Sequence, residues 1–194
     1  MSERLSKRDW IAHGLRALAS EGPEALRAGP MCDALGVSRG SFYWHFKSVG
    51  DFHTQLLDAW ENRNTDAVIR GLGTPKPEPD QLLTLMQSGF GVKQPLDQAM
   101  RIWAARDLSV RDRVDRIDHI RMETIARLLE TAGLATELAR QRAVFLYWAF
   151  VGHSMTMPLL SDRDGQLAAL LDDLVELVTI PGGHAERADG AGKS

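Results

Sequence analysis

The feature that most constrains the fold lies in residues 28–47, where a glycine separates two short segments with apolar residues at helical spacing. These segments, Ala28–Leu35 and Arg39–Phe46, predict two short helices. Between them, Gly36 stands where the first helix must end in a left-handed turn, a conformation that only glycine adopts at low cost. Ser38 is placed to cap the second helix through its hydroxyl. The pattern therefore predicts two helices joined at a fixed angle.

Apolar side chains on both segments should fix that angle, with Val37 filling the space inside the turn. We expect the buried contacts to come from Met31, Leu35, Phe42 and Phe46. Phe42, Tyr43, Trp44 and Phe46 of the second segment fall within five positions and cannot all face one core, so part of this helix must point outward.

An outward face of this composition suits double-stranded DNA. The N-terminus of a helix attracts phosphate, and Gly40 allows close backbone approach. Arg39 and Ser41 are predicted to reach base edges, whereas the remaining polar groups would donate to phosphates. We expect no metal at this face, because His45 has no partner at ligand spacing. The residues predicted to contact DNA are Arg27, Ser38, Arg39, Gly40, Ser41, Tyr43, Trp44, His45 and Lys47.

The string LGVSRGSFYWHFKS, preceded by IAHGLRALASEGPEALRAGPMCDA and followed by DFHTQLLDAW, resembles the N-terminal domain of the tetracycline-repressor (TetR) family. The resemblance covers Lys7–Trp60, and it implies a dimeric repressor with a ligand-binding C-terminal part. Family members often carry Thr or Ser as the cap of the helix before the turn, with its hydroxyl near a phosphate. This chain has Arg27-Ala28-Gly29-Pro30 there, so Arg27 is expected to make that contact instead.

The rest of the chain also has helical periodicity, which predicts an all-α protein of about nine helices. We expect helices over Lys7–Ser20, from Val49 onward, and over Asp80–Val92, Pro95–Arg106, Val110–Thr131, Thr136–Met157 and Asp164–Thr179. Gly71–Pro79 is a breaker-rich loop. The predicted domains are a DNA-binding domain at 7–60, a helical sensing and dimerisation domain at 61–180, and a disordered tail at 181–194.

Two functions are expected of the C-terminal helices. Small residues and leucines on the last two helices predict a homodimer interface, formed by Ala149, Gly152, Leu167, Leu170, Leu171, Leu174, Leu177 and Val178. Methionines and aromatics suit an adaptable pocket for a small apolar or amphipathic effector. Its candidate lining is Met86, Phe90, Met100, Trp103, His119, Met122, Ile125, Tyr147 and Trp148. Both sets remain compatible with an ordinary core inside one chain.

Charge leaves an alternative function open. The formal net charge is −3, and residues 1–60 carry seven Lys or Arg and seven Asp or Glu. A dimeric helical interaction protein that has lost DNA binding therefore remains a second hypothesis. The charged stretch Arg111–Arg121 predicts a solvated helix face with ion pairs four residues apart, such as Asp112 with Arg116.

Other features argue against an enzyme or a membrane protein. Gly152-His153-Ser154-Met155-Thr156 has part of the G-x-S-x-G nucleophile motif, but it lacks the second glycine and follows a helical segment rather than a strand. We expect no catalysis and no cofactor. The single cysteine, Cys32, and an N-terminus without the apolar run of a signal peptide favour the cytoplasm.

Overall fold

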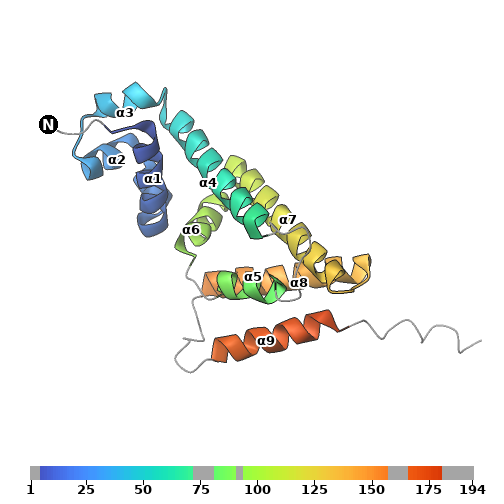
Figure 1. Ribbon diagram of the computed structural model, residues 1–194. Coiled ribbons are helices and arrows are strands. Elements are labelled where there is room, and N and C mark those ends of the chain that lie inside the picture. Colours follow the sequence, from blue (N-terminus) through green and yellow to red (C-terminus); the bar gives the residue numbers. More distant parts are fainter. Residues whose placement is uncertain (1–4, 72–80, 91–93, 157–165, 181–194) are drawn as a thin grey trace, which may run out of the picture. The chain divides into compact units, whose positions relative to one another are not determined.

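The protein is all-α, as the periodicity predicts. The computed structural model describes residues 5–71, 81–90, 94–156 and 166–180, which form nine α-helices, one short 3₁₀ helix and no strand (Figure 1). In chain order these are α1 (Lys7–Glu21), the 3₁₀ helix η1 (Pro23–Leu26), α2 (Ala28–Leu35), α3 (Arg39–His45), α4 (Val49–Gly71), α5 (Gln81–Phe90), α6 (Pro95–Ala104), α7 (Leu108–Thr131), α8 (Thr136–Thr156) and α9 (Gln166–Thr179).

The predicted helix boundaries agree with these bounds to within a few residues, and η1 is the element that the periodicity missed. Gly22, with φ of 81°, and Pro23 end α1 as expected, but Pro23 also starts the single turn of η1. The predicted tail at 181–194 and all of the predicted loop after Gly71 lie outside the described residues.

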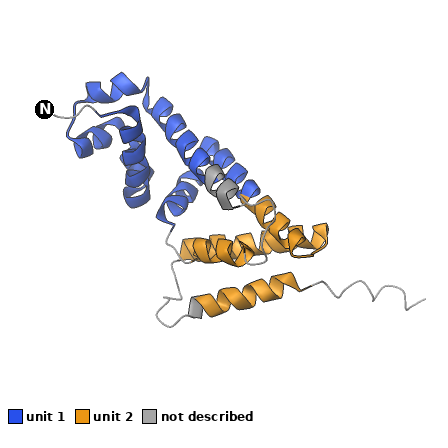
Figure 2. Ribbon diagram, viewed as in Figure 1, with its two compact units in different colours: residues 1–70, 93–120 blue, residues 71–92, 121–194 orange. Residues whose placement is uncertain are grey.

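The chain divides into two compact units (Figure 2). Unit 1 comprises residues 1–70 and 93–120, and unit 2 comprises residues 71–92 and 121–194. The predicted functional domains, 7–60 and 61–180, remain a prediction, and they do not coincide with these packing units. Packing places α6 and the first half of α7 with the N-terminal helices, because their apolar residues complete the N-terminal core.

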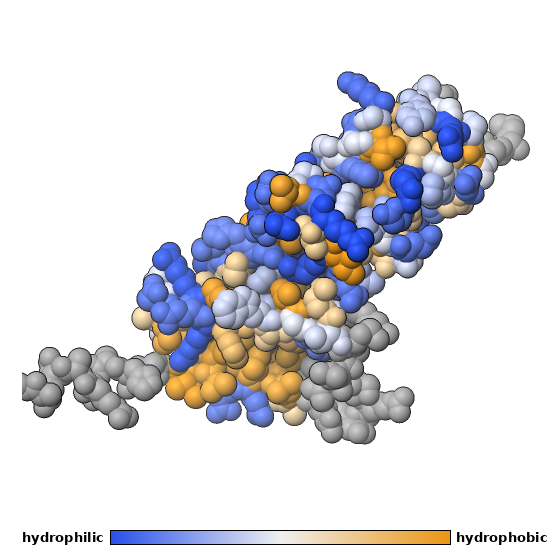
Figure 3. Space-filling model, turned by 180° about the vertical axis from the view of Figure 1, so that it is seen from behind, coloured by the Kyte–Doolittle hydropathy of each residue, from blue (hydrophilic) through white to orange (hydrophobic). Residues whose placement is uncertain are grey.

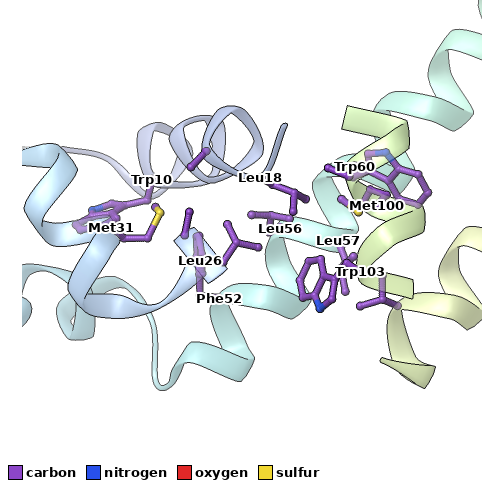
Figure 4. Close-up of a cluster of buried hydrophobic side chains, with 14 of the residues drawn as sticks. Trp10, Leu18, Leu26, Met31, Phe52, Leu56, Leu57, Trp60, Met100 and Trp103 are labelled. Carbon is purple, nitrogen blue, oxygen red and sulfur yellow. The ribbon is translucent and has the colours of Figure 1, made fainter. Parts of the chain in front are cut away.

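The core of unit 1 is rich in aromatic residues (Figure 4). Its largest fully buried side chains include Trp10, Trp60, Phe42, Phe46 and Phe52. Each buried aromatic contributes about 1.5–3 kcal/mol relative to an exposed position.

Helix α1 crosses α4 closely at Gly14. A Cβ atom added to Gly14 would lie 2.7 Å from both Leu56 Cδ1 and Phe52 Cζ. Glycine at this position thus lets α1 approach α4, which follows the two short helices in the chain.

Unit 2 has a smaller, aliphatic core. Buried side chains of α5, α7, α8 and α9 form it, among them Leu82, Leu129, Leu146 and Leu171. The Arg142 guanidinium on α8 donates to the Val178 carbonyl of α9 at 2.7 Å, which ties these two helices together. No described helix is both long and apolar enough to cross a membrane.

Candidate nucleic-acid interface

The turn between α2 and α3 has the predicted geometry. Gly36 lies in the left-handed region with φ of 65° and ψ of 34°. Its N–H donates to the Asp33 carbonyl at 3.2 Å, and the Val37 N–H donates to the Cys32 carbonyl at 3.0 Å. Val37 is partly buried and packs against the unit 1 core. The turn therefore ends α2 with its carbonyls satisfied and starts α3 in a fixed direction.

Helix α3 is held by aromatic contacts on its inner face. Phe42 is fully buried and meets the Trp10 ring edge-to-face, with the ring centroids 5.5 Å apart. Phe46, just after α3, packs against Phe52 of α4 with a centroid distance of 4.9 Å. Met31 is buried and Leu35 is partly buried against the same cluster. The four predicted anchors are confirmed, and such edge-to-face packing restrains the rotation of α3 about its axis.

The opposite face of α3 is open to solvent. The side chains of Tyr43 and Trp44 remain 53% and 65% exposed. Arg39, Gly40 and Lys47 are exposed too. Because helix residues three and four apart share a face, Gly40, Tyr43 and Trp44 lie on one outward face of α3, and the exposed Lys47 follows just after the helix ends; we call these four residues the outward strip. The face thus combines two aromatic rings, a cation and a position without a side chain.

Two predicted site residues border this strip. Ser41 and His45 are partly buried. The His45 ring meets the Trp44 ring edge-to-face at a centroid distance of 4.6 Å and lies 6.3 Å from the Trp10 ring centroid. His45 therefore supports Trp44 from the side of the core, a role that the sequence did not suggest.

The prediction that the Ser38 hydroxyl caps α3 is wrong. Ser38 is the N-cap residue and has the expected extended backbone, but its side chain makes no capping hydrogen bond. Its carbonyl is used instead, accepting from the Ser41 N–H at 2.9 Å and from the Cys32 thiol at 3.6 Å. Burial raises the pKa of the Cys32 thiol, so this sulfur acts as a neutral donor.

Both arginines predicted to contact DNA lie near the start of α2. Arg27 is the N-cap residue of α2; its Nε donates to the Glu24 carbonyl at 3.3 Å, and its guanidinium forms an ion pair with the Glu24 carboxylate. Arg39 Nη2 lies 3.4 Å from the position that a Cβ atom of Gly29 would occupy. Their DNA contacts remain predictions, and Arg27 would have to exchange or share its Glu24 partner to reach a phosphate.

Sequence reasoning missed Lys7 as part of this face. Its ammonium lies 5.5 Å from the centroid of the Phe46 ring, so the start of α1 adjoins the end of α3. Ser6 and Asp9 fix this start through a capping box, in which the Ser6 N–H donates to Asp9 Oδ2 at 2.8 Å. The Ser-x-x-Asp spacing could have indicated the cap. The proximity of Lys7 to Phe46 is tertiary and has no local sequence signal.

A second reciprocal cap follows α3. The Asp51 N–H donates to Ser48 Oγ at 3.0 Å, and the Lys47 N–H donates to Asp51 Oδ2 at 2.8 Å. Hydrogen bonds from the Gln55 side chain and from the Lys47 backbone keep the pKa of Asp51 below its ordinary value. The start of α4 is thereby fixed directly after the exposed strip.

The predicted pocket residues divide between the two units. Met100 and Trp103 are buried in unit 1, whereas Met86 and Tyr147 are buried in unit 2, where Phe90 and Ile125 also pack. Met122 is partly buried, His119 is exposed, and Trp148 is 68% exposed. The pocket therefore remains a prediction.

The predicted dimer residues also differ in exposure. Leu171 and Val178 are buried within unit 2, whereas Leu170 and Leu177 are 45% and 60% exposed. Gly152 is exposed, Ala149 and Leu174 are partly buried, and the Leu167 side chain lies outside the described residues. Phe145, which the sequence reading did not select, is 53% exposed. The interface as a whole remains a prediction.

The serine of the partial hydrolase motif lies inside a helix. Ser154 is part of α8, and its hydroxyl donates to the Val151 carbonyl at 2.8 Å. A nucleophile elbow requires a strand, a sharp turn and then a helix. The His153 ring nitrogen lies 3.1 Å from the Phe90 carbonyl rather than against this serine. The geometry of α8 is therefore that of a structural helix.

The structure and the sequence were compared with known proteins to identify this architecture. No family model and no curated protein matches the sequence. Among solved structures, the reduced form of NemR from Escherichia coli has a TM-score of 0.69 at 16% identity, covering 89% of this chain and 95% of that one. A putative TetR-family transcriptional regulator from Rhodococcus sp. has a TM-score of 0.65 at 19% identity, covering 90% and 99%.

A third similar structure contains a ligand. The transcriptional regulator FadR from Bacillus subtilis, in complex with stearoyl-CoA, has a TM-score of 0.62 at 18% identity, covering 90% of this chain and 98% of that one. These similarities extend over both units, beyond the Lys7–Trp60 segment that carries the sequence resemblance. The chain therefore has the fold of the TetR-family transcriptional regulators.

Proposed function

We propose that this protein is a dimeric, sequence-specific DNA-binding regulator of the TetR family, most simply a repressor that a small-molecule effector releases from its operator. The observation that carries the proposal is the outward strip of α3. Tyr43 and Trp44 are exposed on a short helix whose opposite side is fixed by the fully buried Phe42. A rigid helix presenting aromatic and cationic groups suits insertion into a major groove.

The charge around the strip supports this role, although the first 60 residues are neutral overall. Lys47 and Arg39 are exposed on or beside α3, and Lys7 adjoins its end. Asp51, the acidic group closest in sequence, accepts hydrogen bonds from the Gln55 side chain and the Lys47 N–H. A local cationic footprint is what phosphate contacts require, whatever the net charge of the chain.

A homodimer would supply the second recognition helix. Phe145 and Trp148 of α8 and Leu177 of α9 are large apolar side chains that are more than half exposed. Figure 3 shows a broad hydrophobic area on the part of the molecule that holds unit 2. Covering this surface with a second copy would remove it from water and would set two copies of α3 for neighbouring half-sites, about 34–36 Å apart.

The effector is proposed to be a small apolar or amphipathic molecule. Support comes from the stearoyl-CoA in the FadR structure and from the methionine and aromatic content of the middle helices. Binding would favour one packing of these helices, and a change in that packing would alter the separation of the two recognition helices. Coupling of about 1–3 kcal/mol is typical for such systems.

Selection of bound fragments from a random DNA pool tests the proposal directly. A symmetric pair of half-sites should emerge with the wild-type protein and should disappear with Tyr43→Ala. The salt dependence of binding to the selected site then counts phosphate contacts, since the log–log slope is about −0.9 per neutralised phosphate. No enriched sequence, together with a flat salt response, would favour the interaction protein that has lost DNA binding.

A further inference from the structure

Four charged residues join α4 to α7 inside unit 1. The Arg113 guanidinium lies 2.5 Å from both Asp58 Oδ1 and Glu61 Oε2. The other Glu61 oxygen lies 2.8 Å from the Arg116 guanidinium. Charges therefore alternate along the series Asp58, Arg113, Glu61 and Arg116, which we call the α4–α7 ion cluster. Its two central side chains, Arg113 and Glu61, are each only 19% exposed.

This cluster is not the arrangement that the sequence suggested. The charged stretch of α7 predicted ion pairs along its own helix, such as Asp112 with Arg116. In the structure Arg116 turns to Glu61 of α4 instead, and the residues of the cluster are more than fifty positions apart in the chain. Contacts between residues so far apart in the chain depend on how α4 and α7 pack against each other.

The position of α4 in the chain gives the cluster its importance. Helix α3 ends at His45 and α4 begins at Val49, with the Ser48–Asp51 cap fixing the junction. The exposed strip must therefore follow any change in the direction of α4. Helix α7 is one continuous segment of 24 residues, whose first half belongs to unit 1 and whose second half belongs to unit 2.

Stability alone does not account for the cluster. Leu57, Trp60, Val114 and Ile117 already place both helices in the same apolar core. Buried ion pairs often add little to stability over apolar side chains of similar size, because desolvation of the charges offsets their attraction. A guanidinium held between two carboxylates adds a defined directional geometry to these apolar contacts. What the cluster adds is therefore a fixed relative orientation of α4 and α7.

We infer that Arg113 and Glu61 are positioning residues for DNA recognition, which set the direction of α4, and through it of α3, against α7. This inference rests on the proposed function. It predicts that the cluster converts a displacement of α7 into a change of operator affinity. Such coupling requires two states that differ in free energy, one in which Arg113 holds the carboxylates of α4, as in this structure, and one in which water solvates them.

The first test compares arginine variants on the selected operator and on a scrambled duplex. Arg113→Gln should weaken operator binding about five- to tenfold and should affect the scrambled duplex much less. Arg113→Lys keeps a cation within reach of the carboxylates and should restore most of the affinity. Arg111→Gln removes the same charge from α7 outside the cluster, since Arg111 Nε contacts the Ala104 carbonyl, and should bind like the wild type.

The second test needs no DNA. Spin labels at Ala34→Cys on α2 and Asp112→Cys on α7, both exposed unit 1 sites, report their distance distribution in a Cys32→Ala background. Dilution with unlabelled protein restricts the signal to distances within one chain. Arg113→Gln should broaden or shift the distribution, and Glu61→Gln added to it should have little further effect.

The outcomes separate the two proposals. An unchanged distance distribution in Arg113→Gln, or equal losses of operator affinity in Arg113→Gln and Arg111→Gln, would overturn the positioning role while leaving DNA binding intact. If the wild-type protein selects no DNA site, the proposed function fails and the inference fails with it. A broadened distribution with a selective loss on the operator supports both.

Discussion

Unit 1 and unit 2 are both helical, but they bury their aromatic side chains to different degrees. In unit 1 the tryptophans Trp10 and Trp60 and three phenylalanines are almost completely buried, and among its described residues the exposed aromatics are confined to α3, while Ile102 and Leu108 are exposed aliphatic side chains. In unit 2, α8 leaves Phe145 and Trp148 open, and α9 leaves Leu177 open. A closed core holds an exposed aromatic face rigidly, whereas uncovered apolar side chains are typical of surfaces that bind a partner, as proposed for unit 2.

The largest expected effect tests whether unit 1 depends on its closed core. Phe42→Ala removes a fully buried ring and should lower the free energy of unfolding by about 3–5 kcal/mol. The same substitution at the half-exposed Phe145 of unit 2 should cost about 1 kcal/mol or less in the isolated chain. Urea denaturation followed by circular dichroism measures both, and similar losses would erase the contrast between the units.

Trp148 of α8 and Trp44 of α3 are both exposed, and substituting each tests the role of its surface. Trp148→Arg should weaken self-association by about thirtyfold or more, as expected for a central aromatic of an interface. Trp44→Glu should leave self-association unchanged and should reduce DNA affinity, because it removes the ring and places a negative charge against the phosphates. Sedimentation velocity over a concentration series gives the dimer constants. A dimer that tolerates Trp148→Arg would place the interface elsewhere.

Two serines at helix starts allow a finer comparison within unit 1. Ser48→Ala removes the hydroxyl that accepts from the Asp51 N–H and should cost about 1 kcal/mol of stability. Ser38→Ala should leave stability nearly unchanged, because this hydroxyl makes no capping bond. Thermal unfolding of the two variants under identical conditions distinguishes them. An equal loss would mean that Ser38 caps α3 after all.

The smallest effect concerns pH and the packing of α4. Burial lowers the pKa of His53 below its ordinary value of 6.5, opposed by its hydrogen bond to the Leu26 carbonyl and by the charge of Asp107. The His53 ring also lies against Trp103 of α6, with a centroid distance of 5.0 Å. Because the folded-state pKa lies below the unfolded one, the unfolded chain takes up the proton first as the pH falls.

The stabilising contribution of neutral His53 is therefore complete above pH 6.5 and decreases below it. Gln cannot titrate in this range, and its amide can still donate to the Leu26 carbonyl. As the pH is lowered from above 6.5 to below it, the denaturant midpoint of His53→Gln should therefore decrease less than that of the wild type. Parallel curves for both proteins would show that another group carries the pH dependence.

Local patterns predicted much of unit 1. The glycine turn, the buried Phe42 and Phe46, and the exposed Tyr43 and Trp44 all follow from residue types and helical spacing over a short stretch. Such features depend on backbone conformation and on one-sided burial, both of which a short sequence specifies. The Ser38 cap was one local prediction that failed, because the turn uses the Ser38 carbonyl rather than its hydroxyl.

The rest depended on which helices meet. Neither the approach of Lys7 to Phe46 nor the pairing of Arg113 with Asp58 and Glu61 has a signal within one helix. In α9 the leucines form one broad stripe in sequence, and packing alone divides them into the buried Leu171 and the exposed Leu177. Hydrophobic spacing shows that a face is apolar, but it does not show which neighbour covers it.

Because α7 belongs partly to unit 1 and partly to unit 2, recombination cannot exchange one unit between proteins by cutting the chain at just any position. A fragment cut after Trp60 would lack Met100, Trp103 and Val114, which complete the core around the end of that fragment. A chimera that borrows another protein's sensing helices should therefore retain α6 and α7 as far as Ile120. A crossover point inside α7, rather than between α4 and α5, would keep the core of unit 1 intact.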